Sequence, residues 1–247
     1  MTNAVLLNNV DHQDLRVITR HGPEYGDGIN QVLIFPTEFE DIQREYPILF
    51  RKDANGEYQS VALLGLDRDE NLFLDGERWQ ASYVPAVRRR GPFMIGLQER
   101  EEGGQARREP MIHVDLDHPR ISRAEGEPLF LPHGGNSPYL EQVAAVLRLI
   151  HQGLEVSAPM FAAFEALALI RPVSIEIEVD DTGKYVLPDF LTIDEARLAT
   201  LDGPALERLH KGGFLRAAFL AAASLGNVAR LIERKNRRRA GGSADDG

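Results

Sequence analysis

Cysteine is absent from this chain of 247 residues, and its absence excludes several classes of site. Without thiols there are no disulfides, no iron–sulfur clusters, no thiolate zinc sites and no cysteine nucleophile. Aromatic residues are also few, at 7% with a single tryptophan, and no apolar run approaches the roughly 20 residues that span a bilayer. The Walker A, Gly-x-Gly-x-x-Gly and His-Glu-x-x-His motifs are missing. Motif-based claims for nucleotide, dinucleotide or zinc-protease sites therefore have no support.

Positive charge is scarce, because the chain has 28 Lys and Arg residues against 38 Asp and Glu residues and a net charge of −10. Residues 230–247 hold six cations against three acids, so this segment is +3 and the other 229 residues carry −13. An acidic body repels nucleic acid, and we expect no nucleic-acid partner. The basic cluster Arg234–Arg239 allows weak contact with an anionic membrane surface, although cations also suit the C-terminal end of a helix.

The first residues lack a basic segment followed by a long apolar stretch, and Asp11 comes almost at once. A secretory signal peptide needs both features. We therefore expect a cytoplasmic protein.

Short apolar segments separated by Asp, Asn and Gly fill roughly the first 130 residues. Val32–Phe35, Tyr58–Leu66, Phe93–Leu97 and Met111–Leu116 have the length and composition of strands. Asn55-Gly56 lies between two apolar runs, which is a strong hairpin signal. The charged stretch 99–110 separates two further strands, and we expect it to be a mobile hairpin tip. This half is predicted to form an antiparallel sheet or a partly open barrel.

Helical periodicity dominates the second half. Ser137-Pro138 is a typical helix start, and the apolar stripe behind it runs to His151 with Gly153 as the expected stop. Met160–Ile170 is predicted to be a second, separate helix. Val173–Val179 alternates apolar and polar residues without a fault, so it is predicted to begin a small β-hairpin.

These patterns together predict an α+β fold in which helices surround a small β-hairpin in the C-terminal half. The only strong change in composition, near residues 125–137, has too few linker residues for two independent domains. We therefore expect a single domain over residues 1–239. The stretch 240–247 offers nothing to bury and is predicted to be a disordered tail.

Several linked segments resemble a known family. They run in this order: Phe35-Pro36-Thr37-Glu38-Phe39, Tyr46-Pro47-Ile48, Tyr83-Val84-Pro85, Arg89-Arg90-Gly91-Pro92-Phe93, Arg171-Pro172-Val173 and Ser224-Leu225-x-Asn227-Val228. Over nearly the whole chain they resemble the bacterial SapC family, which takes its name from surface-layer loci. The resemblance implies an accessory role linked to surface-layer or outer-membrane-receptor systems, and it supplies no agreed catalytic residues. Some members are labelled permeases, a label that a chain without long apolar runs contradicts.

An aromatic and arginine group is the main candidate binding site: Trp79, Tyr83, Arg89, Arg90 and Phe93. Such side chains dominate binding hot spots when they stay accessible. The alternative is that the aromatic residues are core and the arginines are solvated around Gly91-Pro92. With the family resemblance and the lack of a catalytic motif, this group favours a non-catalytic accessory or binding protein. We expect a protein or peptide partner and no cofactor.

The alternative function is a non-haem iron, 2-oxoglutarate-type oxygenase built on His113-Val114-Asp115. Residues i and i+2 of a strand share a face, so His113 and Asp115 could both ligate iron, as in a facial triad. The remaining roles, a third ligand and a carboxylate-binding arginine, have these candidates: His133, His151, His210, Arg88–Arg90 and Arg171. Against iron, the tripeptide is short and its neighbours look like an ordinary strand end.

Overall fold

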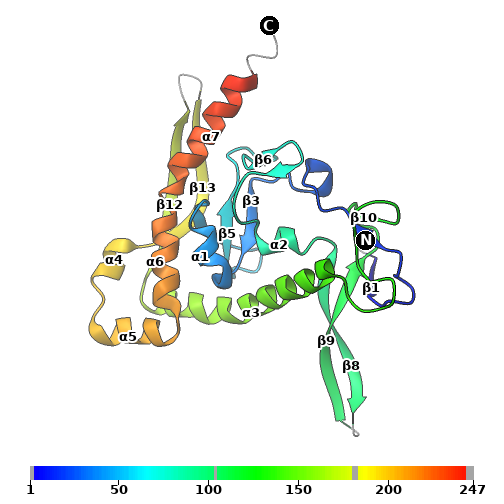
Figure 1. Cartoon of the computed structure of the whole chain (residues 1–247). Coiled ribbons are helices and arrows are strands. Elements are labelled where there is room, and N and C mark those ends of the chain that lie inside the picture. The colour runs from blue at the N-terminus through cyan, green and yellow to red at the C-terminus, as the bar shows by residue number, and fades with distance from the viewer. Residues whose placement is uncertain (1–2, 103–104, 180–182, 243–247) are drawn as a thin grey trace.

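The computed structural model describes residues 3–102, 105–179 and 183–242 (Figure 1). Its strands are β1 Ala4–Leu6, β2 Arg16–Val17, β3 Gln31–Ile34, β4 Ile48–Lys52, β5 Tyr58–Leu63, β6 Leu74–Asp75, β7 Arg78–Trp79, β8 Phe93–Glu102, β9 Gln105–Asp115, β10 Ile121–Ser122, β11 Glu127–Pro128, β12 Ile170–Val179 and β13 Gly183–Ile193. Its helices are the 3₁₀ turns η1 Pro23–Tyr25 and η2 Pro36–Glu38, then α1 Phe39–Ile42, α2 Ala86–Arg89, α3 Pro138–Ala166, α4 Glu195–Ala199, α5 Gly203–Lys211, α6 Phe214–Ser224 and α7 Asn227–Gly242.

The predicted α+β class is confirmed. The strands pair antiparallel in a five-stranded sheet of order β12-β13-β4-β5-β3, two three-stranded sheets, β1-β9-β8 and β10-β2-β11, and the β6-β7 pair. All four sheets of the described residues are open, and none closes into a barrel. The strands around β2 are only two residues long, too short to close a barrel wall.

The predicted hairpin at Asn55-Gly56 joins β4 to β5. Gly56 has a φ of 82°, and its N–H donates to the Asp53 carbonyl over 3.0 Å. The Asp53 side chain accepts from the Asn55 N–H over 2.9 Å, as aspartates in turns do. The other expected tip, residues 99–110, is shorter than predicted. The β8–β9 pairing continues to Glu102 and Gln105, and residues 103–104 lie outside the described residues.

The C-terminal hairpin is larger than predicted and is part of the main sheet. Its strands β12 and β13 have 10 and 11 residues, and Leu191 of β13 pairs with Phe50 of β4. Ile193 is buried in the same core as Phe50, so burial of apolar side chains draws the hairpin onto the first half of the chain. The two halves expected from the sequence are therefore one layered structure.

Helix α3 is a single helix of 29 residues where the sequence predicted two. Ser137 caps it as expected, since its Oγ accepts from the Leu140 N–H. Gly153 is inside the helix, not at its end. A Cβ at this position would lie 2.3 Å from the Phe35 Cβ, so the glycine allows close contact between α3 and η2.

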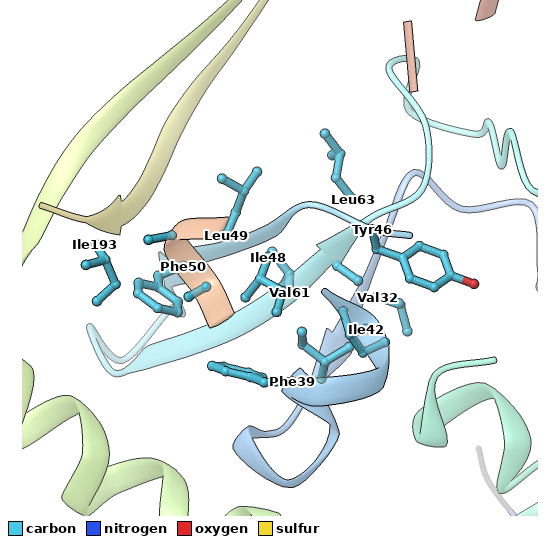
Figure 2. Packing of buried hydrophobic residues seen from close by; sticks show 14 of the residues in the cluster. Val32, Phe39, Ile42, Tyr46, Ile48, Leu49, Phe50, Val61, Leu63 and Ile193 are labelled. Carbon is cyan, nitrogen blue, oxygen red and sulfur yellow. The ribbon is translucent and has the colours of Figure 1, made fainter. Parts of the chain in front are cut away.

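The buried apolar side chains form two clusters. The large cluster fills the space around the five-stranded sheet, where Phe39, Phe50 and Val61 are fully buried (Figure 2). The small cluster gathers Val17 of β2, Phe93 of β8 and other residues near the N-terminus of α3. Helix α3 contributes to both, because its first half packs in the small cluster and its second half in the large one.

Helices α6 and α7 cover the main sheet beside β12 and β13 (Figure 1). By length and composition, Phe214–Ala240 is the one stretch of the described residues that could cross a membrane, and 39% of its most apolar window is buried. Ala218 and Ala221 are fully buried. The Ser224 Oγ accepts from the Ile48 N–H over 2.8 Å. Packing on the sheet thus accounts for part of the apolar composition.

The basic side chains of α7 hold the helix to the body. Lys235 is almost fully buried and donates to Asp67 and Glu70 over 2.5 and 2.6 Å. Arg238 donates to the carbonyls of Asn71 and Leu74 over 3.0 and 2.7 Å. Much of the positive charge that suggested a membrane contact is therefore used inside the structure. Helix α7 continues through residues 240–242, and the rest of the expected tail lies outside the described residues.

Candidate functional site

The five residues of the predicted binding group do not form one surface. Trp79 is 9% exposed, and its Nε1 donates to the Tyr46 hydroxyl over 2.7 Å. Trp79 and the half-buried Tyr83 pack in the large cluster, whereas the fully buried Phe93 packs in the small one. Arg89 is exposed and lies over the Tyr83 ring at 5.1 Å. Of this group, the arginines are the members whose polar ends face space that a ligand could fill.

A buried carboxylate places these arginines. Glu38 is 1% exposed, and its Oε1 accepts from the Ala86 N–H at the start of α2 and from the Tyr83 hydroxyl, over 2.7 and 3.0 Å. Its Oε2 accepts from the Phe35 N–H over 3.1 Å. Burial raises the pKa of Glu38, although these hydrogen bonds act in the opposite direction. The contacts fix the start of α2, and Arg88 and Arg89 follow within one turn.

The centre of the site is Asp27, which is fully buried. The Arg88 Nε and Nη2 lie 2.9 and 2.8 Å from its Oδ1, and the Arg120 Nη2 donates to Oδ2 over 2.7 Å. The His21 Nδ1 and the Gly22 N–H also contact Oδ2, each at 3.1 Å. Burial raises the pKa of Asp27, but the His21 hydrogen bond and the two arginine charges outweigh it and lower the pKa to about 2. We call Asp27, Arg88 and Arg120 the arginine hub.

Backbone carbonyls and one ring complete the hub. The Arg120 Nη1 donates to the carbonyls of Ile18 and Arg20 over 2.9 and 2.5 Å. Its guanidinium lies 4.7 Å from the centre of the Tyr25 ring. The Arg88 Nη2 donates to the Tyr25 carbonyl over 2.9 Å. Both guanidinium groups are therefore held in fixed orientations.

A cavity of about 750 Å³ opens beside the hub, and we call it the arginine cavity. One side is cationic and comes from the segment around α2 and from the hub, while the other side is the N-terminal half of α3. The residues that define these two sides are Arg88, Arg89, Arg120, Tyr139, Val143 and Val146. Glu127 at the edge is the one carboxylate among the lining residues. Arginines and residues of α3, both polar and apolar, therefore line one space.

His113 and Asp115 of the alternative iron site lie two residues apart on β9. The Asp115 Oδ1 accepts from the Asn3 and Asp117 N–H groups, over 3.0 and 3.2 Å. The His113 ring packs against Gly96, where a Cβ would lie 2.3 Å from its Cε1. Among the described residues, no three His, Asp or Glu side chains gather as metal ligands would. His133, His151 and His210, the expected third ligands, therefore do not join the pair.

Asp27 and Arg120 were not predicted from the sequence. Asp27 stands between Gly26 and Gly28 and looks like a turn residue, and Arg120 follows a proline at a strand end. Their partners are distant, since Asp27 is 61 residues from Arg88 and 93 from Arg120. One signal was available, because the Arg-Arg-Arg run at 88–90 is a dense cationic stretch in an acidic chain.

Comparison with known proteins gives one match. The family model described as SapC matches residues 7–231, which is nearly the whole described chain. No curated protein and no solved structure matches. The match confirms the predicted family resemblance, and it names no ligand or partner.

Proposed function

Because the chain belongs to the SapC family, whose model covers residues 7–231, we propose that it is a non-catalytic binding protein that takes an apolar group carrying a carboxylate into the arginine cavity. The observation that carries the proposal is that three arginines and apolar residues of α3 line the same cavity. In the surface-layer or outer-membrane-receptor setting that the family resemblance implies, such a ligand would be a free organic acid or the C-terminal end of a peptide.

Charge favours an anion. The chain as a whole carries −10, yet Arg88, Arg89 and Arg120 line this one cavity. Asp27 offsets one of the two hub charges, because it is shared between Arg88 and Arg120. Glu127 is exposed at the edge, so solvent weakens its contribution. The cavity therefore keeps a local positive excess that attracts a carboxylate.

Donors remain available for that carboxylate. Arg89 makes no hydrogen bond to a described residue, and the Arg88 contacts with Asp27 and Tyr25 leave its Nη1 unused. The Tyr139 hydroxyl also lines the cavity, and burial raises its pKa to about 12, so it stays protonated at neutral pH and can donate. Two guanidinium donors and a phenol suit the two oxygens of a carboxylate.

The apolar half of the ligand would lie against α3. Val143 and Val146 line the cavity one turn apart but are almost fully buried, and Ala145 is the exposed apolar residue of α3 beside them. A cavity of about 750 Å³ is within the usual range for sites that hold small organic ligands.

Calorimetric titration of the full chain tests the proposal with matched probes. Octanoate and octylamine share an apolar chain and differ in charge, and a short peptide ending in leucine is compared with its C-terminal amide. We expect saturable binding of octanoate or of the free-acid peptide, and none of octylamine or of the amide. Whichever acid binds identifies the source of the carboxylate.

Variants locate the binding. Arg89→Gln removes one charged donor and is expected to lower the affinity for the acid roughly tenfold or more. Arg216→Gln, a surface change on α6 outside the cavity, is the control and is expected to leave affinity unchanged. Equal binding of octanoate and octylamine, or an Arg89→Gln variant that binds like the wild type, would contradict the proposal.

A further inference from the structure

A second, smaller cavity of about 210 Å³ lies beside the arginine hub. It shares Arg88, Gly91 and Arg120 with the arginine cavity, but its other lining residues differ. They come from α2 and the chain after it, the start of β8, the last residue of β9 and the turn that follows, and include Arg90, Met94, Asp115 and His118. Arg89 lines only the arginine cavity and Arg90 only the small one, so each arginine reports on one site.

Arg90 is a half-buried cation without an acidic partner among the described residues. Its Nη1 donates to the Phe93 carbonyl over 2.9 Å, and this is its one hydrogen bond there. Burial lowers the pKa of Arg90, and the neighbouring Arg88 charge lowers it further. A buried charge that only a carbonyl compensates is costly, and an anion would offset that cost.

His118 adds a neutral donor to the same cavity. Its Nδ1 accepts from the Arg120 N–H over 3.1 Å, so the neutral ring carries its proton on Nε2. Burial lowers the pKa of His118, with Arg120 acting in the same direction and Asp115 against it, which keeps the ring neutral at pH 7. The Nε2–H can therefore donate to an acceptor in the cavity.

Asp115 is the one carboxylate among the residues that line this cavity, and the surrounding backbone partly satisfies it. Its Oδ1 accepts from the Asn3 and Asp117 N–H groups. Three arginines, Arg88, Arg90 and Arg120, line the same space. Asp27 offsets one of them from the other side of the hub, so positive charge remains in excess.

We propose that the small cavity binds an inorganic oxyanion such as phosphate or sulfate, held by Arg90, Arg120 and the Nε2–H of His118. This site is separate from the one in the proposed function and does not depend on it. A tetrahedral oxyanion presents several acceptors, which suits converging guanidinium and imidazole donors. The cavity of about 210 Å³ is large enough for such an ion with water.

Titration with sodium phosphate and sodium sulfate, against sodium chloride at matched ionic strength, tests this inference. We expect saturable binding of phosphate or sulfate by calorimetry and none of chloride. Arg90→Gln is expected to lower the affinity for the oxyanion roughly tenfold or more. Arg89→Gln is expected to lower it less than about twofold. The affinity for octanoate should instead fall in Arg89→Gln and change little in Arg90→Gln. The two variants therefore distinguish failure of the oxyanion proposal from failure of the proposed function.

A second variant guards against a folding defect. Arg90→Lys keeps the charge but not the planar donor group, and we expect an intermediate loss of affinity with an unchanged circular dichroism spectrum. The inference is overturned if no saturation occurs up to about 10 mM phosphate or sulfate at low ionic strength. Equal weakening by Arg89→Gln and Arg90→Gln would also overturn it, because that result indicates general charge attraction with no built site.

Discussion

The large cluster and the arginine hub are both buried, but they use opposite chemistry. In the large cluster Phe39, Phe50 and Val61 exclude water with apolar surface alone. In the hub a fully buried carboxylate holds two guanidinium groups, and it ties η1 and α2 to the chain at β10. The ion pairs of Asp27 with Arg88 and Arg120 thus connect parts of the chain that pack in different apolar clusters.

That difference bears on the proposed binding role of the hub. Replacing a buried ion pair by apolar residues of similar volume is often neutral or stabilising, so stability alone does not require Asp27, Arg88 and Arg120. The large cluster shows that this chain builds an apolar core readily. An apolar core cannot supply positive charge. The hub does so, because it holds Arg88 and Arg120, which line both cavities, in fixed orientations. Its position supports a binding role.

The largest expected effect comes from Asp27→Asn. The variant leaves two buried guanidinium groups without their anion, and it should lose about 3 kcal/mol or more of unfolding free energy at pH 7. The pKa of Asp27 is about 2 in the folded state, below its ordinary value of 3.8, so its contribution is present above pH 4 and is lost as the pH falls toward 2. Urea unfolding at several pH values measures this difference.

Phe50→Ala in the large cluster is the control for that experiment. It should cost about 3–5 kcal/mol through lost burial and a cavity, with no pH dependence of its own. The difference in unfolding free energy between wild type and Asp27→Asn should become smaller from pH 4 to pH 2. The difference between wild type and Phe50→Ala should stay constant. If Asp27→Asn lowers the unfolding free energy by the same amount at pH 7 and at pH 2, the ion pairs of Asp27 do not stabilise the fold as described.

The sequence predicted the local parts of the fold well. Ser137 as a helix cap and Gly56 in a hairpin turn are set by neighbouring residues, and both are confirmed. Gly153 was misread, because the rule that glycine ends helices competes with a tertiary contact to Phe35 that no local pattern records. The extent of the C-terminal hairpin was missed for the same reason, since β13 pairs with β4 far away in the chain.

The candidate site was predictable only in part. The arginines at 88–90 stand out in an acidic sequence, whereas Asp27 and Arg120 acquire meaning only when the fold brings them together. The aromatic residues of the predicted group followed the common tendency of large rings to be buried. Composition therefore indicated which charges matter, and topology decided where they meet.

Gly153→Ala should have a smaller effect than Asp27→Asn. Alanine gains roughly 1 kcal/mol in helix propensity over glycine, but its Cβ would lie 2.3 Å from the Phe35 Cβ. Overpacking costs about 1–3 kcal/mol, so a net loss of about 1 kcal/mol is expected in urea unfolding. Gly203→Ala in α5 is the matched control, because nothing lies within 4 Å of its added Cβ, and it should not destabilise. A stabilised Gly153→Ala would mean that α3 and η2 are not in close contact.

An effect as small as that of Gly153→Ala is expected from Gly56→Val, where the reason for glycine is different. A Cβ at Gly56 meets nothing within 4 Å, so any cost comes from its φ of 82°, which a β-branched residue adopts poorly. The loss should be about 1 kcal/mol, and Gly56→Asn should lose less because asparagine tolerates left-handed backbone. Urea unfolding measures both, and a Gly56→Val variant as stable as the wild type would contradict the turn. Since Gly56 touches neither the hub nor its cavities, octanoate and phosphate affinities should stay unchanged, in contrast with Asp27→Asn.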